Sequence, residues 1–270
     1  MIEKIDLSQV LNIAIEAGKE IIDVYNTEFE IEQKADESPL TIADRKSHQV
    51  IESQLYKQFP KIPVLSEEGK HQSYAKRQDW TYAWVVDPLD GTKEFIKRNG
   101  EFTVNIALIE NGIPVLGVIY APVLDIAYIA KKGVGSYKLD NVSDRTFSTE
   151  EEIIQGLKLP VSEKRDYISV VASRSHLSKE TEEYVDRLRE KYGEVDMTSA
   201  GSSLKLCLVA EGKADVYPRF APTMEWDTAA GQAIVEQSGG TVVKVDNSEP
   251  LSYNKEDLLN PWFIVQHRKL

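Results

Sequence analysis

Two carboxylates lie three residues apart in the segment Trp84–Phe95, which reads WVVDPLDGTKEF. The apolar start of this segment predicts a buried strand. We expect Pro88 to stop that strand, so that Asp87 emerges at its carboxyl end. One tight turn can then aim Asp87 and Asp90 at a single point. Because two close carboxylates repel each other unless a cation lies between them, a metal site is one explanation. Taken alone, the stretch equally fits a solvated turn followed by a helix cap.

Gly91 and Thr92 follow directly after the second carboxylate. A permissive glycine lets neighbouring backbone N–H groups converge, and such groups suit a phosphate oxygen. The segment therefore combines ligands for a cation with donors for an anion.

Two further acidic elements lie elsewhere in the chain. Glu67 and Glu68 follow an apolar strand expected over residues 62–65, although a Glu-Glu pair is by itself usually a surface feature. Asp227 lies in WDTAAG at residues 226–231, where capping the following helix is the simpler explanation. The combination favours a metal site, since hard oxygen ligands without a histidine or thiol pattern suit Mg²⁺ rather than Zn²⁺ or copper.

Other catalytic patterns are weak or missing. The four histidines show no pairing at ligand spacing, so we expect them at the surface or in packing. His176 is the exception, because it lies in ASRSH after an apolar strand, where α/β folds bind ligands. The chain has no Walker motif and no dinucleotide-binding fingerprint, and Ser202 and Ser203 lack the context of a serine hydrolase nucleophile.

The composition limits the kinds of molecule that we expect the protein to bind. The 270-residue chain is 41% hydrophobic and 28% charged, which fits a globular protein with a substantial core. Its 32 basic and 44 acidic residues give a net charge of −12, which disfavours nucleic acid polymers and anionic membrane surfaces. An anionic substrate would therefore need metal cations or a local cluster of Lys and Arg. The only cysteine, Cys207, lies in the apolar sequence KLCLVA. We expect a buried thiol there, with cysteine catalysis as the lesser alternative.

No apolar run approaches the roughly 20 residues that span a bilayer. The start of the chain also carries acids among its apolar residues, unlike a signal peptide. We therefore expect a cytoplasmic protein, with a peripheral position at the inner membrane left open, and either a monomer or a homodimer.

Mixed helices and strands are expected around the acidic motifs. An amphipathic helix capped by Ser8 opens the chain, and the other helices are expected over residues 42–59, 179–192, 202–210 and 227–237. Strands are expected over residues 62–65, 82–86, 102–109, 113–120, 125–130, 168–172, 214–217, 241–245 and 262–265. The Asn111-Gly112 pair predicts a hairpin, so the sheet is at least partly antiparallel. The pattern favours a layered α/β or α+β sandwich, with a lobe boundary in the polar stretch at about residues 140–160.

The motifs resemble those of the inositol monophosphatase superfamily, whose members are Mg²⁺-dependent, lithium-sensitive phosphatases. The resemblance rests on Ser66-Glu67-Glu68, DPLDGT at residues 87–92 and WDTAAG at residues 226–231, in that order, and it covers essentially the whole chain. It implies a five-layer α-β-α-β-α sandwich, shared with fructose-1,6-bisphosphatase. It also implies one functional unit with its site between two lobes. Residues 1–150 would form an α+β lobe with most metal ligands, and residues 160–270 an α/β lobe with Asp227 and the substrate pocket.

The resemblance also implies residue roles. Two or three Mg²⁺ ions would be held by the side chains of Glu67, Asp87, Asp90 and Asp227 and by the backbone carbonyl of Leu89. Asp44 would pair with the hydroxyl of Thr92 to orient the attacking water, so the catalytic set is Asp44, Glu67 and Thr92. Phosphate ester hydrolysis needs a positioned water and neutralised charge, which two Mg²⁺ ions about 4 Å apart supply.

Three stretches resemble the bisphosphate nucleotidase branch of the superfamily: KEF at residues 93–95, SRSH at 173–176 and GSSLKLCLVAEGKADVYPR at 201–219. This implies hydrolysis of the 3′-phosphate of adenosine 3′,5′-bisphosphate to AMP, with phosphoadenosine phosphosulfate as a further substrate. Our candidates for the 5′-phosphate are Lys205 and Arg219, although Lys205 also fits a solvated helix face. The full substrate-binding set is Glu67, Leu89, Asp90, Gly91, Thr92, Lys93, Ser173, His176, Ser202, Lys205, Arg219 and Asp227.

Two alternatives remain at this point. An inositol monophosphatase or another small sugar phosphatase would use the same scaffold but would not accept an adenine ring. A metal-binding regulatory protein without turnover would have lost a metal ligand or the pair that orients water, and the sequence retains all of them.

Overall fold

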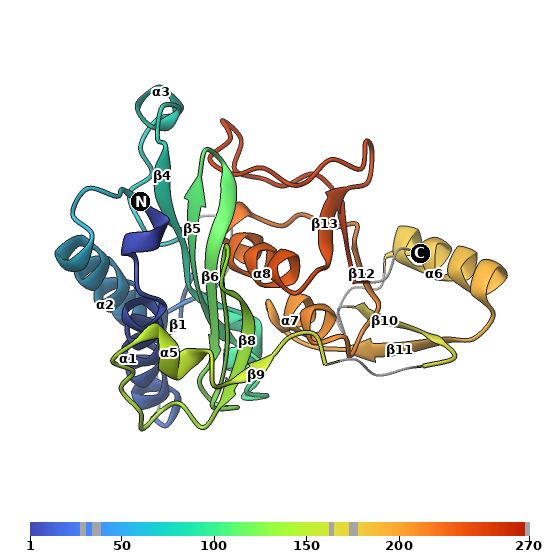
Figure 1. The fold of residues 1–270 in the computed structure, drawn as a ribbon, viewed down its shortest axis with the longest axis horizontal. Coiled ribbons are helices and arrows are strands. Elements are labelled where there is room, and N and C mark those ends of the chain that lie inside the picture. Colours follow the sequence, from blue (N-terminus) through green and yellow to red (C-terminus); the bar gives the residue numbers. More distant parts are fainter. Residues whose placement is uncertain (28–30, 34–38, 162–164, 173–177, 268–270) are drawn as a thin grey trace.

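Five layers of helices and strands make up the molecule (Figure 1). The computed structural model describes all residues except 28–30, 34–38, 162–164, 173–177 and 268–270. A helical layer, a seven-stranded sheet, a second helical layer, a five-stranded sheet and one outer helix follow each other along the long axis, from left to right in Figure 1. The expected five-layer α-β-α-β-α sandwich is confirmed.

The seven-stranded sheet has the strand order β3-β4-β5-β6-β7-β8-β9. Its first pair is parallel and all other pairs are antiparallel. Both faces are buried, which explains the nearly continuous apolar runs of its central strands. The strands are β3 (Val64–Ser66), β4 (Tyr82–Asp90), β5 (Thr103–Glu110), β6 (Ile113–Ala121), β7 (Ile126–Lys131), β8 (Gly135–Asp140) and β9 (Leu157–Lys158).

The helices α1 (Leu7–Tyr25) and α2 (Ile42–Gln58) cover the outer face of this sheet. The apolar positions of α1 recur at three- and four-residue steps and pack into the first hydrophobic cluster. The expected cap Ser8 is wrong, because Asp6 caps α1 and its carboxylate accepts the Ser8 N–H at 2.8 Å.

The five-stranded sheet has the strand order β11-β10-β12-β14-β13. Pairs β10–β11 and β10–β12 are parallel, and the other two pairs are antiparallel. Strand β11, with the polar sequence VDMTS, was not expected from the sequence. The strands are β10 (Ile168–Ala172), β11 (Val195–Ser199), β12 (Val216–Arg219), β13 (Thr241–Lys244) and β14 (Phe263–Gln266).

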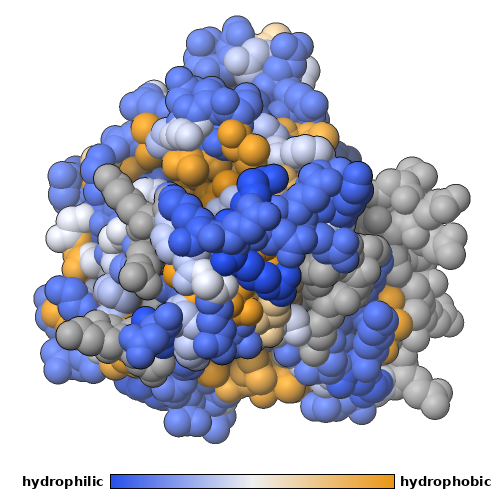
Figure 2. All heavy atoms as spheres, turned by 90° about the vertical axis from the view of Figure 1, so that its right-hand side faces the viewer, coloured by the Kyte–Doolittle hydropathy of each residue, from blue (hydrophilic) through white to orange (hydrophobic). Residues whose placement is uncertain are grey.

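Helices α7 (Leu204–Glu211) and α8 (Glu225–Gln237) fill the space between the two sheets. Helix α6 (Lys179–Tyr192) covers the far side of the second sheet through a small apolar cluster. Figure 2 looks onto this side, where the surface is mainly hydrophilic with smaller hydrophobic patches. The single cysteine, Cys207 on α7, is buried, as expected.

Helix α8 approaches the first sheet unusually closely at Gly117 of β6. A Cβ at this position would lie 2.3 Å from the Ala230 carbonyl oxygen, a distance that no side chain tolerates. The glycine therefore sets the distance between the sheet and the helix.

The remaining elements are short: η1 (Ile2–Lys4), β1 (Ile31–Gln33), β2 (Pro39–Thr41), α3 (Tyr74–Arg77), α4 (Thr92–Ile96) and α5 (Glu150–Ile153). Across the part of the chain that the structure describes, none of the helices combines the length and apolar character needed to cross a bilayer. The first sheet uses residues up to Lys158 and the second begins at Ile168, while the division into lobes 1–150 and 160–270 stays a prediction.

The expectation that Pro88 ends the strand is wrong. Strand β4 continues to Asp90 and pairs with β5 on both sides of the proline. The register shifts between Asp87 and Asp90, so Pro88 lies in a bulge where no backbone N–H is needed. The bulge replaces the expected tight turn between the two aspartates.

Candidate active site

An acidic cluster lies where the end of β4 meets the start of α8. Asp87 and Asp90 come from the bulged strand end, and Asp227 comes from the first turn of the helix. One carboxylate oxygen from each residue lies within 4.8 Å of those of the other two. Residues about 140 positions apart in sequence are thus brought together, as the acidic motifs predicted.

The electrostatics of the cluster favour a bound cation. Burial first, and then the charge of Glu67, raise the pKa of Asp87 well above its ordinary value. Burial, followed by the charges of Asp90 and Glu67, also raises the pKa of Asp227. Carboxylates that repel each other in this way are stabilised when a divalent cation lies between them. The all-oxygen donor set fits a hard cation.

Glu67 and Asp44 border the cluster. Glu67 directly follows β3, and its N–H donates to the Val86 carbonyl at 3.1 Å, which extends the pairing with β4. Asp44 is completely buried in the first turn of α2. The charge of Asp44 also contributes to the raised pKa of Asp87, which puts it within electrostatic reach.

Helix α2 is fastened to the bulge by Ser47, one turn from Asp44. The Ser47 hydroxyl donates a 2.7 Å hydrogen bond to the Pro88 carbonyl. One helix therefore carries a predicted catalytic carboxylate and stabilises the strand end that carries two others.

Asp90 is held by polar side chains that the sequence did not single out, apart from Ser202. Its Oδ2 accepts hydrogen bonds from Ser202 at 2.9 Å and Ser203 at 2.6 Å. The Asn105 amide lies 3.4 Å from the same oxygen and donates to Ser203 Oγ at 2.8 Å. The Ser203 hydroxyl also lies 2.8 Å from the Asp227 carbonyl oxygen. Ser203 thus connects the strand end that carries Asp90 with the helix start that carries Asp227.

Asp227 is not the N-cap residue of α8, but its side chain takes part in capping the helix. Met224 is the N-cap of α8, and Asp227 is the third helical residue, whose Oδ2 accepts the Met224 N–H at 2.8 Å. The carboxylate therefore points back over the helix start, near the positive end of the helix dipole.

Gly91 adopts a left-handed backbone with φ of +93° and is the N-cap of α4, which Thr92 begins. A side chain at Gly91 would be strained by this conformation and would crowd Ser202 at 3.2 Å. Leu89 is buried, and its N–H donates to Asp87 Oδ1 at 3.1 Å. Pairing of Asp44 with Thr92 and ligation by the Leu89 carbonyl stay predictions.

A cavity of about 160 Å³ opens beside the cluster. Lys205 is 7% exposed, so the alternative of a solvated helix face is wrong. Its Nζ donates to the Ser202 carbonyl at 2.6 Å and lies 5.7 Å from the centroid of the Tyr217 ring. Burial lowers the pKa of Lys205 to about 8. The cavity is lined by Asp90, Lys93, Glu94, Ser202, Ser203, Lys205, Leu206, Tyr217, Arg219, Thr223, Asp227, Thr228 and Phe263.

Arg219 reaches this cavity from the end of β12, where its Nε donates to Thr223 Oγ1 at 2.6 Å. Lys93 lines the cavity from the exposed side of α4. The structure thus brings Lys93, Ser202, Lys205 and Arg219 together with the acidic cluster. Ser173 and His176 lie outside the described residues, and their proposed contacts stay predictions.

Residues 6–269 match the inositol monophosphatase family, so the chain belongs to this family. It is similar to two proteins named 3′(2′),5′-bisphosphate nucleotidase CysQ. That of Escherichia coli K12 is 47% identical, with 96% of this chain and 98% of the relative covered. That of Haemophilus influenzae is 38% identical, with coverage of 96% and 91%.

Solved structures agree with this assignment. The crystal structure of CysQ from Bacteroides thetaiotaomicron, described as a bacterial member of the inositol monophosphatase family, superimposes with a TM-score of 0.88. It is 53% identical and covers 97% of both chains. The extragenic suppressor protein suhB from Bartonella henselae is 27% identical, with a TM-score of 0.74 and coverage of 96% and 93%.

Proposed function

We propose that this protein is a 3′(2′),5′-bisphosphate nucleotidase, which hydrolyses the 3′-phosphate of adenosine 3′,5′-bisphosphate to give AMP and phosphate. Phosphoadenosine phosphosulfate is proposed as a further substrate. The observation that carries the proposal is the near-full-length similarity to CysQ proteins, at 47% identity in E. coli and 53% in B. thetaiotaomicron. The acidic cluster and the adjoining cavity, to which Lys93, Lys205 and Arg219 contribute, support it, because such a substrate carries two separate phosphates.

The proposed cofactor is Mg²⁺, with two or three ions. Glu67, Asp87, Asp90 and Asp227 would hold them, together with the Leu89 carbonyl. When bound, the metal supplies a more acidic water and neutralises negative charge at the transferring phosphoryl group. The bound ions would also offset the electrostatic repulsion between an anionic substrate and a chain of net charge −12.

The protein groups would orient the reactants. Asp44 and Thr92 are proposed to position the attacking water in line with the bond from phosphorus to the 3′ oxygen. The backbone N–H groups of Gly91 and Thr92 would bind the scissile phosphate. Water adds to phosphorus as the 3′ P–O bond breaks, and the departing oxygen takes up a proton to give the ribose hydroxyl.

The second phosphate would lie in the cavity lined by Lys205 and Arg219. A buried ammonium and a guanidinium facing one cavity provide the charge that a 5′-phosphate requires. Lys93, Ser173, His176 and Ser202 are proposed to contact the rest of the substrate. The arrangement of two lobes around one site, a cytoplasmic location and a monomer or homodimer are predictions of the same proposal.

Phosphate release with Mg²⁺ tests the proposal. Adenosine 3′,5′-bisphosphate, inositol 1-phosphate and fructose 1,6-bisphosphate are compared at equal concentration, with and without lithium. We expect a large preference for the nucleotide, loss of activity with EDTA and inhibition by lithium. Preference for inositol 1-phosphate or the sugar would overturn the proposed substrate while keeping the metal site. No release from any of the three would overturn the proposed activity.

A further inference from the structure

A buried ion pair lies in the first turn of α8, two residues before Asp227. Glu225 is completely buried, and its Oε1 lies 2.6 Å from Lys255 Nζ. Its Oε2 accepts the backbone N–H of Asn254 at 2.5 Å. A buried carboxylate needs such partners, because leaving the charge unpaired is strongly unfavourable.

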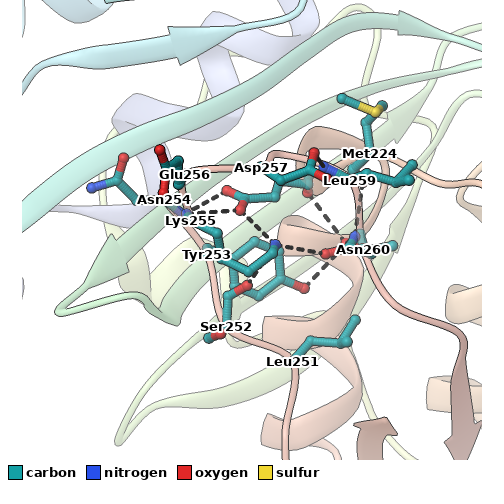
Figure 3. Close-up of polar contacts among 12 residues, drawn as sticks. Met224, Leu251, Ser252, Tyr253, Asn254, Lys255, Glu256, Asp257, Leu259 and Asn260 are labelled. Atoms are coloured by element: carbon teal, nitrogen blue, oxygen red, sulfur yellow. Dashed lines mark hydrogen bonds and ion pairs between the residues drawn. The ribbon is translucent and has the colours of Figure 1, made fainter. Parts of the chain in front are cut away.

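The lysine belongs to residues 251–260, a segment without helix or regular strand that wraps around the start of α8 (Figure 3). Lys255 Nζ also donates to Asn260 Oδ1 at 3.2 Å. The Asn260 amide in turn donates to the Met224 carbonyl at 3.0 Å and to Thr228 Oγ1 at 2.9 Å. The ammonium thus fixes both Glu225 and the asparagine that holds the N-cap residue.

The N-cap residue Met224 connects this network to the acidic cluster. Its carbonyl is held by Asn260, and its N–H donates to Asp227 Oδ2 at 2.8 Å. These two groups belong to the successive peptide units that meet at the Met224 Cα, so a shift of this residue changes the position of the Asp227 carboxylate. The segment holds the helix start by backbone bonds as well, since the Glu225 N–H donates to the Leu258 carbonyl at 3.0 Å.

Arg77 anchors the segment to the first half of the chain. Its side chain is 3% exposed and donates to Asn254 Oδ1 at 2.9 Å, while the Asn254 amide donates back to the Arg77 carbonyl at 2.6 Å. Arg77 ends α3, ten residues beyond Glu67. The network therefore spans the two parts of the chain that supply acidic residues.

We propose that Lys255 is a positioning residue for Asp227, and that the chain Lys255–Asn260–Met224 presets the carboxylate geometry for the metal ion. The inference rests on the proposed metal role of Asp227. Removing a residue that orients a metal ligand without touching the metal typically weakens metal affinity by about 10–100-fold. If Lys255 only stabilised the fold, its replacement would lower the melting temperature and leave the metal affinity unchanged.

The test is a Lys255→Met variant of the full-length protein, with Mn²⁺ binding measured by electron paramagnetic resonance in the absence of substrate. We expect Mn²⁺ to bind about 10–100-fold more weakly than in the wild type. The KM for the nucleotide at saturating metal should stay unchanged. Lys244→Met is the matched control, because Lys244 Nζ lies 3.4 Å from the exposed carboxylate of Glu249, in an ion pair outside this network. It should bind Mn²⁺ like the wild type.

Asn260→Ala provides a second variant in case Lys255→Met does not fold, since it keeps the buried ion pair and removes the side-chain hydrogen bonds of Asn260 to Met224, Thr228 and Lys255. Wild-type Mn²⁺ affinity in a folded Lys255→Met, or in Asn260→Ala if the first does not fold, overturns the inference. Asp227→Asn separates this result from a failure of the proposed function. If that variant also binds Mn²⁺ normally, the metal role of Asp227 itself is wrong.

Discussion

The His71 ring packs against the Trp226 indole, with ring centroids 5.2 Å apart and an interplanar angle of 42°. The same histidine has its Nε2 2.8 Å from the Ser66 carbonyl oxygen. Ser66 precedes Glu67 and Trp226 precedes Asp227, so one side chain contacts the neighbours of two proposed metal ligands. From the sequence we expected His71 to lie at the surface or to take part in packing. The structure shows that it contacts Ser66 and Trp226, the residues that precede Glu67 and Asp227.

Replacing this histidine should therefore loosen the metal site. We expect His71→Leu to raise the Mg²⁺ concentration for half-maximal activity by about 10-fold or more, because the strand end and the helix start lose a common contact. Steady-state rates over a Mg²⁺ series measure the effect. His267→Leu is the matched control, since His267 Nε2 also lies 2.9 Å from a backbone carbonyl, that of Ser238, at the other end of α8. Equal shifts in both variants would refute a special role for His71.

Asp90→Asn should remove activity while leaving the fold intact. A neutral amide cannot replace a carboxylate that is proposed to share a cation with Asp87 and Asp227, so we expect turnover to fall by more than about 100-fold. Turnover is measured at saturating Mg²⁺, and circular dichroism checks the fold. The control is Asp186→Asn, whose carboxylate pairs with Arg189 on the exposed face of α6. Near-normal turnover in Asp90→Asn would remove Asp90 from the proposed metal shell.

Thr92→Ala separates water orientation from metal binding. Loss of the hydroxyl should slow turnover by about 10²–10⁴-fold, the range for a positioned proton-transfer group, with little change in Mg²⁺ affinity. Thr92→Ser keeps a hydroxyl and should retain most of the activity. Calorimetric titration with Mg²⁺ decides the outcome, because a collapse of metal affinity in the alanine variant contradicts the proposed role.

The pH dependence of substrate binding should reveal Lys205. Burial lowers the pKa of this lysine to about 8, so its ammonium is present below pH 8 and is lost above it. If it binds the 5′-phosphate, the KM for adenosine 3′,5′-bisphosphate rises above pH 8, by up to about 10-fold per pH unit.

Adenosine 3′-monophosphate is the matched substrate, because it lacks the 5′-phosphate, and its KM should not follow this trend. Lys205→Met should raise the bisphosphate KM at pH 7 and remove the dependence. A parallel rise for both substrates in the wild type would assign the effect to the metal site instead.

The sequence was sufficient for the elements with a clear periodicity and for the acidic motifs. Helix α1 and the hairpin of β5 and β6 lie where the three- and four-residue apolar spacing and the Asn111-Gly112 turn placed them. Asp87, Asp90 and Asp227 were identified from the combination of the acidic motifs and from their resemblance to a known family, because each motif alone also fits a turn or a helix cap.

Other features depend on contacts between distant segments and could not be seen in one sequence. Strand β11 is polar, and its pairing with β10 decides its structure. The bulge at Pro88 requires the partner strand β5. Ser203 and Asn105 lie 98 residues apart in the sequence and bond to each other beside Asp90 in the folded chain, so neither had a local signal beyond small size or polarity.

The contact of Gly117 with the Ala230 carbonyl makes the apolar core and the acidic cluster interdependent. We expect a substitution at this glycine to displace α8 and with it Asp227, which lies three residues before Ala230 on the same helix. In a screen of random mutants scored by activity, Gly117 would therefore be ranked with the catalytic residues, although it touches no ligand. Substitutions at the centre of the first sheet are therefore limited by the geometry of the acidic cluster as well as by core packing.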